Sequence, residues 1–193
     1  MCRSEIFRKM KSGRYCHYKK FPNSIATKYM KKSKKIVRKD DNLDLLWSII
    51  DNDQYKDYIK PDENTITVHL RVGDVIDDTN NSVDDFLNTT VNNYVRNRKY
   101  YEKIISQLPN NINNVIFIYG YHTNGDHTKS EQYINSISKI FKLYGFNVKY
   151  RKDIDPDEDF IYMCNSKHFV RSGGGFSKLI ANMVKNNGNI VYN

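Results

Sequence analysis

From residue 43 onward, strand-like and helix-like patterns alternate along the chain, and this alternation constrains the fold more than any other feature. Runs of alternating or continuous apolar residues predict strands at 65–72, 115–119, 147–150, 167–171 and 189–192. Apolar residues at helical spacing predict helices at 43–58, 83–108 (in one or two pieces), 130–144, 157–165 and 176–186. Such alternation is typical of parallel sheets with right-handed crossovers. We therefore expect an α/β fold with a Rossmann-like, mostly parallel sheet flanked by helices.

The first predicted strand, 65–72, leads directly into polar residues that suit ligand binding. Its alternation places apolar side chains on one face and His69 and Arg71 on the other, and Gly73 then allows a turn before Asp74. Ligands of open α/β sheets bind beyond the carboxyl ends of strands, where the guanidinium of Arg71 could meet an anion. A simpler interpretation is a surface ion pair between Arg71 and Asp74 that caps the strand.

A second chemical feature is the glycine-rich turn from Ser172 to Ser177, between a predicted strand and a predicted helix. Its glycines would let a ligand approach the backbone, and the amides and dipole at a helix N-terminus favour anions. The turn matches neither the dinucleotide fingerprint nor the nucleoside-triphosphate loop. A tight structural turn is the alternative, since glycine is the usual residue wherever φ is positive.

These two segments together resemble the fucosyltransferase superfamily, and the alpha-1,2-fucosyltransferases most. The first segment, His69-Leu70-Arg71-Val72-Gly73-Asp74, is similar to their His-x-Arg-x-Gly-Asp-like element, and His69-Leu70-Arg71 is also similar to the protein O-fucosyltransferases. The second segment carries residues at the intervals of their later block: Asp159, Met163, Lys167-His168, Phe169-Val170, Phe176-Ser177 and Ala181. The resemblance covers roughly residues 65–190. Val72 stands where these enzymes usually have a second arginine, and Lys178 and Leu179 replace their tryptophans.

The resemblance implies the donor half of a GT-B glycosyltransferase that binds a nucleotide-diphosphate sugar, typically GDP-fucose, and transfers it with inversion. It implies no required metal, and we expect no separate cofactor. Arg71 would hold the diphosphate, and His69 and Asp159 would lie near the nucleoside. The residues lining the phosphate and sugar would be Gly73, Ser172, Gly174, Gly175, Phe176 and Ser177.

Inverting transfer also needs a general base for the acceptor hydroxyl. Three carboxylates after the first strand are candidates, namely Asp74, Asp77 and Asp78. We retain Asp74 and Asp78, together with Arg71, as the candidate catalytic residues. The acceptor, a glycan or a protein, is not specified by the sequence.

The charge of the chain divides it into a basic N-terminal segment, 1–40, and a predicted nucleotide-sugar-binding domain, 41–193. The net charge is +9, but residues 1–39 carry +13 and the remainder −4. The basic segment is either a solvated or docking arm or a contact for nucleic acid or another polyanion, and counterion release would make such binding steeply salt-dependent. About 60 residues before the first strand are too few for an acceptor domain. The alternatives are a minimal transferase, an inactive nucleotide-sugar-binding relic or one part of an assembly.

The remaining signals favour structural roles. Three scattered cysteines argue against a disulfide framework, and we expect a reducing, cytoplasmic location, an inert buried Cys164 and no membrane span. In the helix 83–108, Tyr94 and Tyr101 lie on an apolar stripe and are expected in the core. His122, Asp126 and His127 follow a buried strand, where a donor contact is one interpretation and a hydrogen-bonded loop histidine the favoured one.

Overall fold

The computed structural model describes residues 25–33, 42–51, 59–121 and 125–193. A five-stranded sheet in the order β3-β2-β1-β4-β5 forms its centre, and every neighbouring pair of strands is parallel. The strands are β1 (Thr65–His69), β2 (Asn114–Tyr119), β3 (Asn147–Lys152), β4 (His168–Val170) and β5 (Ile190–Tyr192). The described helices are α2 (Ile25–Ser33), α3 (Leu43–Ile50), α4 (Asp74–Asp77), α5 (Val83–Asn88), α6 (Arg98–Ile105), α7 (Thr128–Leu143), α8 (Pro156–Cys164) and α9 (Gly175–Asn186). The expected Rossmann-like α/β fold is confirmed.

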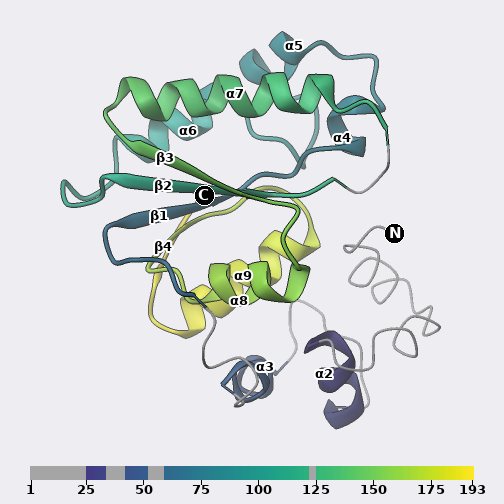
Figure 1. The fold of residues 1–193 in the computed structure, drawn as a ribbon, viewed down its shortest axis with the longest axis vertical. Coiled ribbons are helices and arrows are strands. Elements are labelled where there is room, and N and C mark those ends of the chain that lie inside the picture. Colours follow the sequence, from purple (N-terminus) through teal and green to yellow (C-terminus); the bar gives the residue numbers. More distant parts are fainter. Residues whose placement is uncertain (1–24, 34–41, 52–58, 122–124) are drawn as a thin grey trace.

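Helices cover both faces of the sheet. The helices α4 to α7 lie on one face, and α8 and α9 lie on the other, with α3 and α2 packed outside them (Figure 1). The connections β1–β2 and β2–β3 run over the first face, and the connections β3–β4 and β4–β5 run over the second. This change of face coincides with a reversal of strand order, because β2 and β3 extend the sheet to one side of β1 while β4 and β5 extend it to the other. Open α/β sheets bind their ligands at such a topological switch point, which here lies at the carboxyl ends of β1 and β4.

The alternation in β1 distributes its side chains between two buried layers. Ile66 and Val68 lie in the core beneath α4 to α7, whereas His69 contacts Phe176 of α9 on the opposite face. All five residues of β1 are buried, as is usual for a strand of a parallel sheet covered on both sides.

The predicted helix 83–108 forms as two helices, α5 and α6, because asparagines interrupt it. The side chain of Asn92 accepts hydrogen bonds from the amides of Tyr94 and Val95, which makes a turn, and Asn97 caps the N-terminus of α6. The predicted helix 43–58 ends at Ile50 in the structure, and its residues 52–58 lie outside the described part of the chain.

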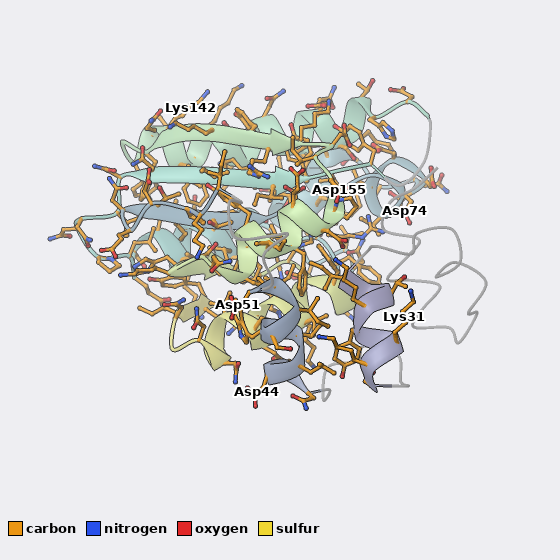
Figure 2. All side chains as sticks on the ribbon, turned by 60° about the horizontal axis from the view of Figure 1, so that its bottom comes forward. Lys31, Asp44, Asp51, Asp74, Lys142 and Asp155 are labelled. Carbon is orange, nitrogen blue, oxygen red and sulfur yellow. The ribbon has the colours of Figure 1, made fainter. Side chains whose placement is uncertain are left out.

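Part of the basic N-terminal segment belongs to the folded body. Ile25 and Tyr29 of α2 are buried in the same apolar cluster as Leu46 and Ile49 of α3. Tyr29 also accepts a hydrogen bond from the amide of Asn42 at 3.2 Å. The exposed Lys31 projects outward from this helix (Figure 2). The other residues of 1–40 lie outside the described part, so the expected polyanion contact stays a prediction.

Candidate functional site

Apart from Asp159, the residues predicted to bind a ligand gather at the carboxyl ends of β1 and β4. Arg71, Gly73 and Asp74 follow β1, and the glycine-rich turn follows β4. Because β1 and β4 are neighbours, with Val68 paired to Val170, the two turns leave the sheet side by side. Figure 2 shows Asp74 toward this end of the sheet and Lys142 of α7 toward the opposite end.

A buried hydrogen bond joins the two turns. The ring nitrogen Nδ1 of His69 lies 2.8 Å from the hydroxyl of Ser172, and both residues are almost completely buried. The ring of Phe176 meets the imidazole edge-on at 5.6 Å between centroids. His69 and Ser172, predicted from two separate segments, are therefore direct partners.

The side chain of Arg71 is hydrogen-bonded to residues that directly follow it in the chain. Its guanidinium donates one hydrogen bond to the carboxylate of Asp74 at 2.6 Å and another to the carbonyl oxygen of Val72. The side chains of Arg71 and Asp74 are 17% and 25% exposed, so the pair is partly open to solvent. The structure therefore contains the Arg71–Asp74 ion pair that the simpler interpretation of this segment predicted. An anion could reach this guanidinium only by sharing it with Asp74 or by displacing that carboxylate.

Two of the three glycines in the turn have a structural explanation. A Cβ atom on Gly173 would lie 1.8 Å from the carbonyl oxygen of Asn93, and the amide of Gly173 donates to the carbonyl of Tyr94 at 2.9 Å. Gly174 has φ of 89°, a conformation that favours glycine. Gly175 begins α9 and is exposed, and no side chain from the described part of the chain caps this N-terminus. The first amides of a helix have no intrahelical partner, so α9 presents donors here.

Tyr94 lies beside the glycine-rich turn, and its expected place in the core is wrong. The residue is 47% exposed, and its ring would be 3.5 Å from a Cβ on Gly174. Because the chain turns at Asn92, Tyr94 does not lie in a helix and does not continue the apolar stripe. Tyr101 of α6 is buried as expected. The Asn92-Asn93 pair was the sequence signal for this turn. Tyr94 is therefore a neighbour of the site that the sequence pattern missed.

The three candidate carboxylates have different environments. Asp74 is paired with Arg71, and Asp78 is exposed at the end of α4. Asp77 has a side chain only 7% exposed and accepts hydrogen bonds from the amide of Ser130 at 2.9 Å and from its hydroxyl at 2.7 Å. Asp77 therefore holds the first turn of α7, and its carboxylate is committed to these hydrogen bonds rather than to solvent.

The histidine of the following loop is bonded, as favoured from the sequence. Nδ1 of His127 lies 2.9 Å from the carboxylate of Asp77, and its ring stacks on Tyr121 at 3.8 Å between centroids. Asp126 accepts a hydrogen bond from the amide of Thr128 and so also supports the start of α7. His122 lies outside the described residues.

Asp159 lies in the first turn of α8, where it forms an ion pair with Arg151 at 3.1 Å. Burial raises the pKa of this carboxyl to about 6, although the guanidinium of Arg151 acts in the opposite direction. Its neighbour Phe160 lies 6.0 Å from the ring of Phe176, which in turn contacts His69. The carboxylate of Asp159 thus pairs with Arg151 of β3, and it is the neighbouring Phe160 that lies near the aromatic ring beside His69.

The described residues offer little enclosure or metal-binding capacity at this site. They contain no group of three His, Cys, Asp or Glu side chains that could hold a metal ion. A hollow of about 650 Å³ lies between α5 and α7, and another of about 370 Å³ lies near Pro109 and Phe146 at the amino end of the sheet. Both are away from the β1 and β4 turns. The described part of the candidate site is therefore an edge of the sheet with fixed polar groups.

Comparisons with family models, curated proteins and solved structures found no match to this chain. Among the residues described, no helix combines the length and the apolar character needed to cross a membrane. The structure thus defines an α/β protein with a Rossmann-like parallel sheet and a cluster of polar residues at its switch point.

Proposed function

We propose that this chain binds a nucleoside-diphosphate sugar, with GDP-fucose as the leading candidate, at the carboxyl ends of β1 and β4. The observation that carries the proposal is the His69–Ser172 hydrogen bond, which joins the arginine-bearing turn and the glycine-rich turn at the switch point. Nucleotides of open α/β sheets bind at such points. An arginine fork and the amides of a helix N-terminus suit the two charges of a diphosphate.

In this proposal each turn contributes a different kind of donor. Arg71 supplies the guanidinium, and the amides of Gly174 and Gly175 supply uncharged donors at the positive end of the α9 dipole. Asp74 orients Arg71 in the free protein and shares it when the ligand is bound. The exposed ring of Tyr94 offers a surface beside Gly174 for the organic part of the ligand.

The suggested identity of the donor rests on the resemblance to the fucosyltransferases. Several of the matching positions, namely Met163, Phe169, Val170 and Ala181, are buried in the core, where their spacing also serves packing. The polar matches therefore carry the resemblance, namely His69, Arg71, Asp74, Asp159, Lys167, His168 and Ser177. Val72 is fully buried, so an arginine there would have to displace apolar packing.

Transfer of the sugar to an acceptor hydroxyl with inversion is the second part of the proposal. Asp74 and Asp78 remain the candidates for the general base. Asp74 lies beside Arg71 but is already hydrogen-bonded to it, whereas Asp78 is exposed and unconstrained by burial. A nucleotide-sugar-binding relic is the alternative, and it would bind GDP-fucose without transferring fucose to an acceptor and without releasing GDP.

Calorimetric titration of the full chain with GDP, GDP-fucose and UDP tests donor binding. We expect the guanine nucleotides to bind, and we expect Arg71→Ala to weaken that binding about tenfold or more, because charge-assisted hydrogen bonds contribute roughly 1.5–3 kcal/mol. Arg98→Ala removes an exposed arginine from the first turn of α6 and is the matched control. Absence of nucleotide binding to the unaltered chain, or equal binding by Arg71→Ala, contradicts the proposal.

A further inference from the structure

Two arginines next to the glycine-rich turn have no acidic partner among the residues that the structure describes. Arg96 lies in the loop before α6, and Arg171 lies directly before Ser172. Both are half-buried, and the Nε atom of each is buried without a hydrogen-bond partner. Among the other arginines of the described chain, Arg71 pairs with Asp74 and Arg151 with Asp159, and Arg98 is exposed to solvent.

Tyr100 of α6 contacts both the side chain of Arg96 and the backbone of Arg171. Its hydroxyl donates to the carbonyl oxygen of Arg171 at 2.7 Å and lies 3.3 Å from the carbonyl oxygen of Tyr192. The guanidinium carbon of Arg96 lies over the same ring, 5.1 Å from its centroid. This cluster is on the β5 side of the glycine-rich turn, whereas His69 approaches the turn from the β1 side.

The electrostatics at Tyr100 agree with this arrangement. Burial raises the pKa of its hydroxyl, and the positive charges of Arg96 and Arg171 both act to lower it. Two guanidinium groups thus act on one buried hydroxyl from different segments of the chain. Partly buried charges are costly without a counter-charge, and an unsatisfied buried donor adds to that cost. An oxyanion would supply both the charge and the acceptor atoms.

We propose that Arg96 and Arg171 form a second anion site, which binds a phosphate group as inorganic phosphate or as a phosphomonoester. Phosphate matches the planar donor fork of arginine, and two forks can contact different oxygens of one group. The nearby ring of Tyr94 would contact the organic part of a monoester. The site does not depend on nucleotide-sugar binding, because neither Arg71 nor Asp74 belongs to it.

Calorimetry of the full chain in phosphate-free buffer, with inorganic phosphate and with ribose 5-phosphate, tests this proposal. We expect Arg96→Gln and Arg171→Gln each to weaken binding at least tenfold, and we expect phosphate to raise the Tm of the unaltered chain but not of these variants. Arg98→Gln, which changes an exposed arginine outside both candidate sites, should bind phosphate as the unaltered chain does. Tighter binding of ribose 5-phosphate would identify a monoester as the ligand, and equal binding the free ion. Both results support the site.

Absence of phosphate binding overturns the proposal, as does binding that Arg71→Ala removes while Arg96→Gln and Arg171→Gln retain it. The second result would assign the phosphate to the candidate donor site. Arg171→Lys separates binding from folding, because it keeps the charge and loses the fork. We expect it to retain the Tm of the unaltered chain in phosphate-free buffer and to bind phosphate more weakly. If both the Arg171→Lys and the Arg171→Gln variants fold and bind phosphate as tightly as the unaltered chain, the proposed role of Arg171 is contradicted.

Discussion

Gly173 connects the glycine-rich turn to the loop before α6. Its amide donates to the carbonyl of Tyr94, and its missing side chain leaves room for the backbone of Asn93. This close approach positions Tyr94 on Gly174 and holds the Arg96 loop against the end of β4. A single glycine therefore supports both of the anion sites that we propose.

We expect Gly173→Ala to destabilise the protein by about 1–3 kcal/mol or more, because the added Cβ would meet the carbonyl oxygen of Asn93 at 1.8 Å and force the two backbones apart. Urea denaturation of the variant and the unaltered chain measures this change. Gly125→Ala is the control, since a Cβ there would have no atom within 4 Å. Equal stability of the Gly173→Ala variant would contradict the close packing.

At this scale the sequence predicted the site residues but not their partners. The motifs indicated His69, Arg71 and Ser172 from their types and positions at strand ends. The His69–Ser172 hydrogen bond joins residues 103 positions apart, and local patterns do not encode such a distance. The burial of Asp77 was missed for the same reason, because its partners are Ser130 and His127 on another segment.

The helix α8 has a cluster of acidic residues at its N-terminus, and part of this cluster is buried. Asp155 caps its N-terminus, and Asp157 and Asp159 lie in its first turn. Burial raises the pKa of Asp157 to about 6, although a hydrogen bond from the amide of Ile25 acts to lower it. The contact between Asp157 and Ile25 also joins α8 to α2, so part of the basic segment is held by an acidic helix end.

This arrangement makes stability depend on pH. Because the pKa of Asp157 is higher in the folded protein than the ordinary value near 3.8, the folded state keeps its proton to higher pH than the unfolded state. The contribution to stability is present below about pH 4 and is lost as the pH rises to about 6. The difference between these two pKa values corresponds to at most about 3 kcal/mol.

We expect Asp157→Asn to reduce the loss of unfolding free energy between pH 4 and pH 6, since the amide does not titrate and still offers an oxygen to Ile25. Urea denaturation at pH 4, 5, 6 and 7 measures the difference from the unaltered chain. Asp44→Asn changes an exposed acid of α3 and should leave the pH profile unaltered. Identical profiles for Asp157→Asn and the unaltered chain would contradict the raised pKa.

Element types followed from periodicity, and element boundaries depended on side-chain hydrogen bonds. All five strands formed where apolar runs predicted them. The division of 83–108 into α5 and α6 required the turn at Asn92, and the helix α2 was hidden within a strongly basic stretch. Its apolar residues Ile25 and Tyr29 pack against α3, so tertiary contacts rather than local composition explain this helix.

In the whole molecule, the order of the strands decides where a ligand could bind. The alternation of strands and helices predicted a parallel sheet, but it did not specify that β4 lies next to β1. That neighbourhood brings together two motifs that are about 100 residues apart and makes one candidate site of them. The order of the strands depends on which face of the sheet each helix covers, and this is a property of the complete folded chain.

The most direct measurement of the proposed donor site is an NMR titration of the isotope-labelled full chain with GDP. We expect the largest backbone amide shifts at Gly174 and Gly175, with smaller shifts at Gly73 and Asp74, and we expect Arg71→Ala to abolish them at the same GDP concentration. Shifts confined to the hollow between α5 and α7, near Lys129 and Lys139, or no shifts at all, would contradict a diphosphate site at the switch point of the sheet.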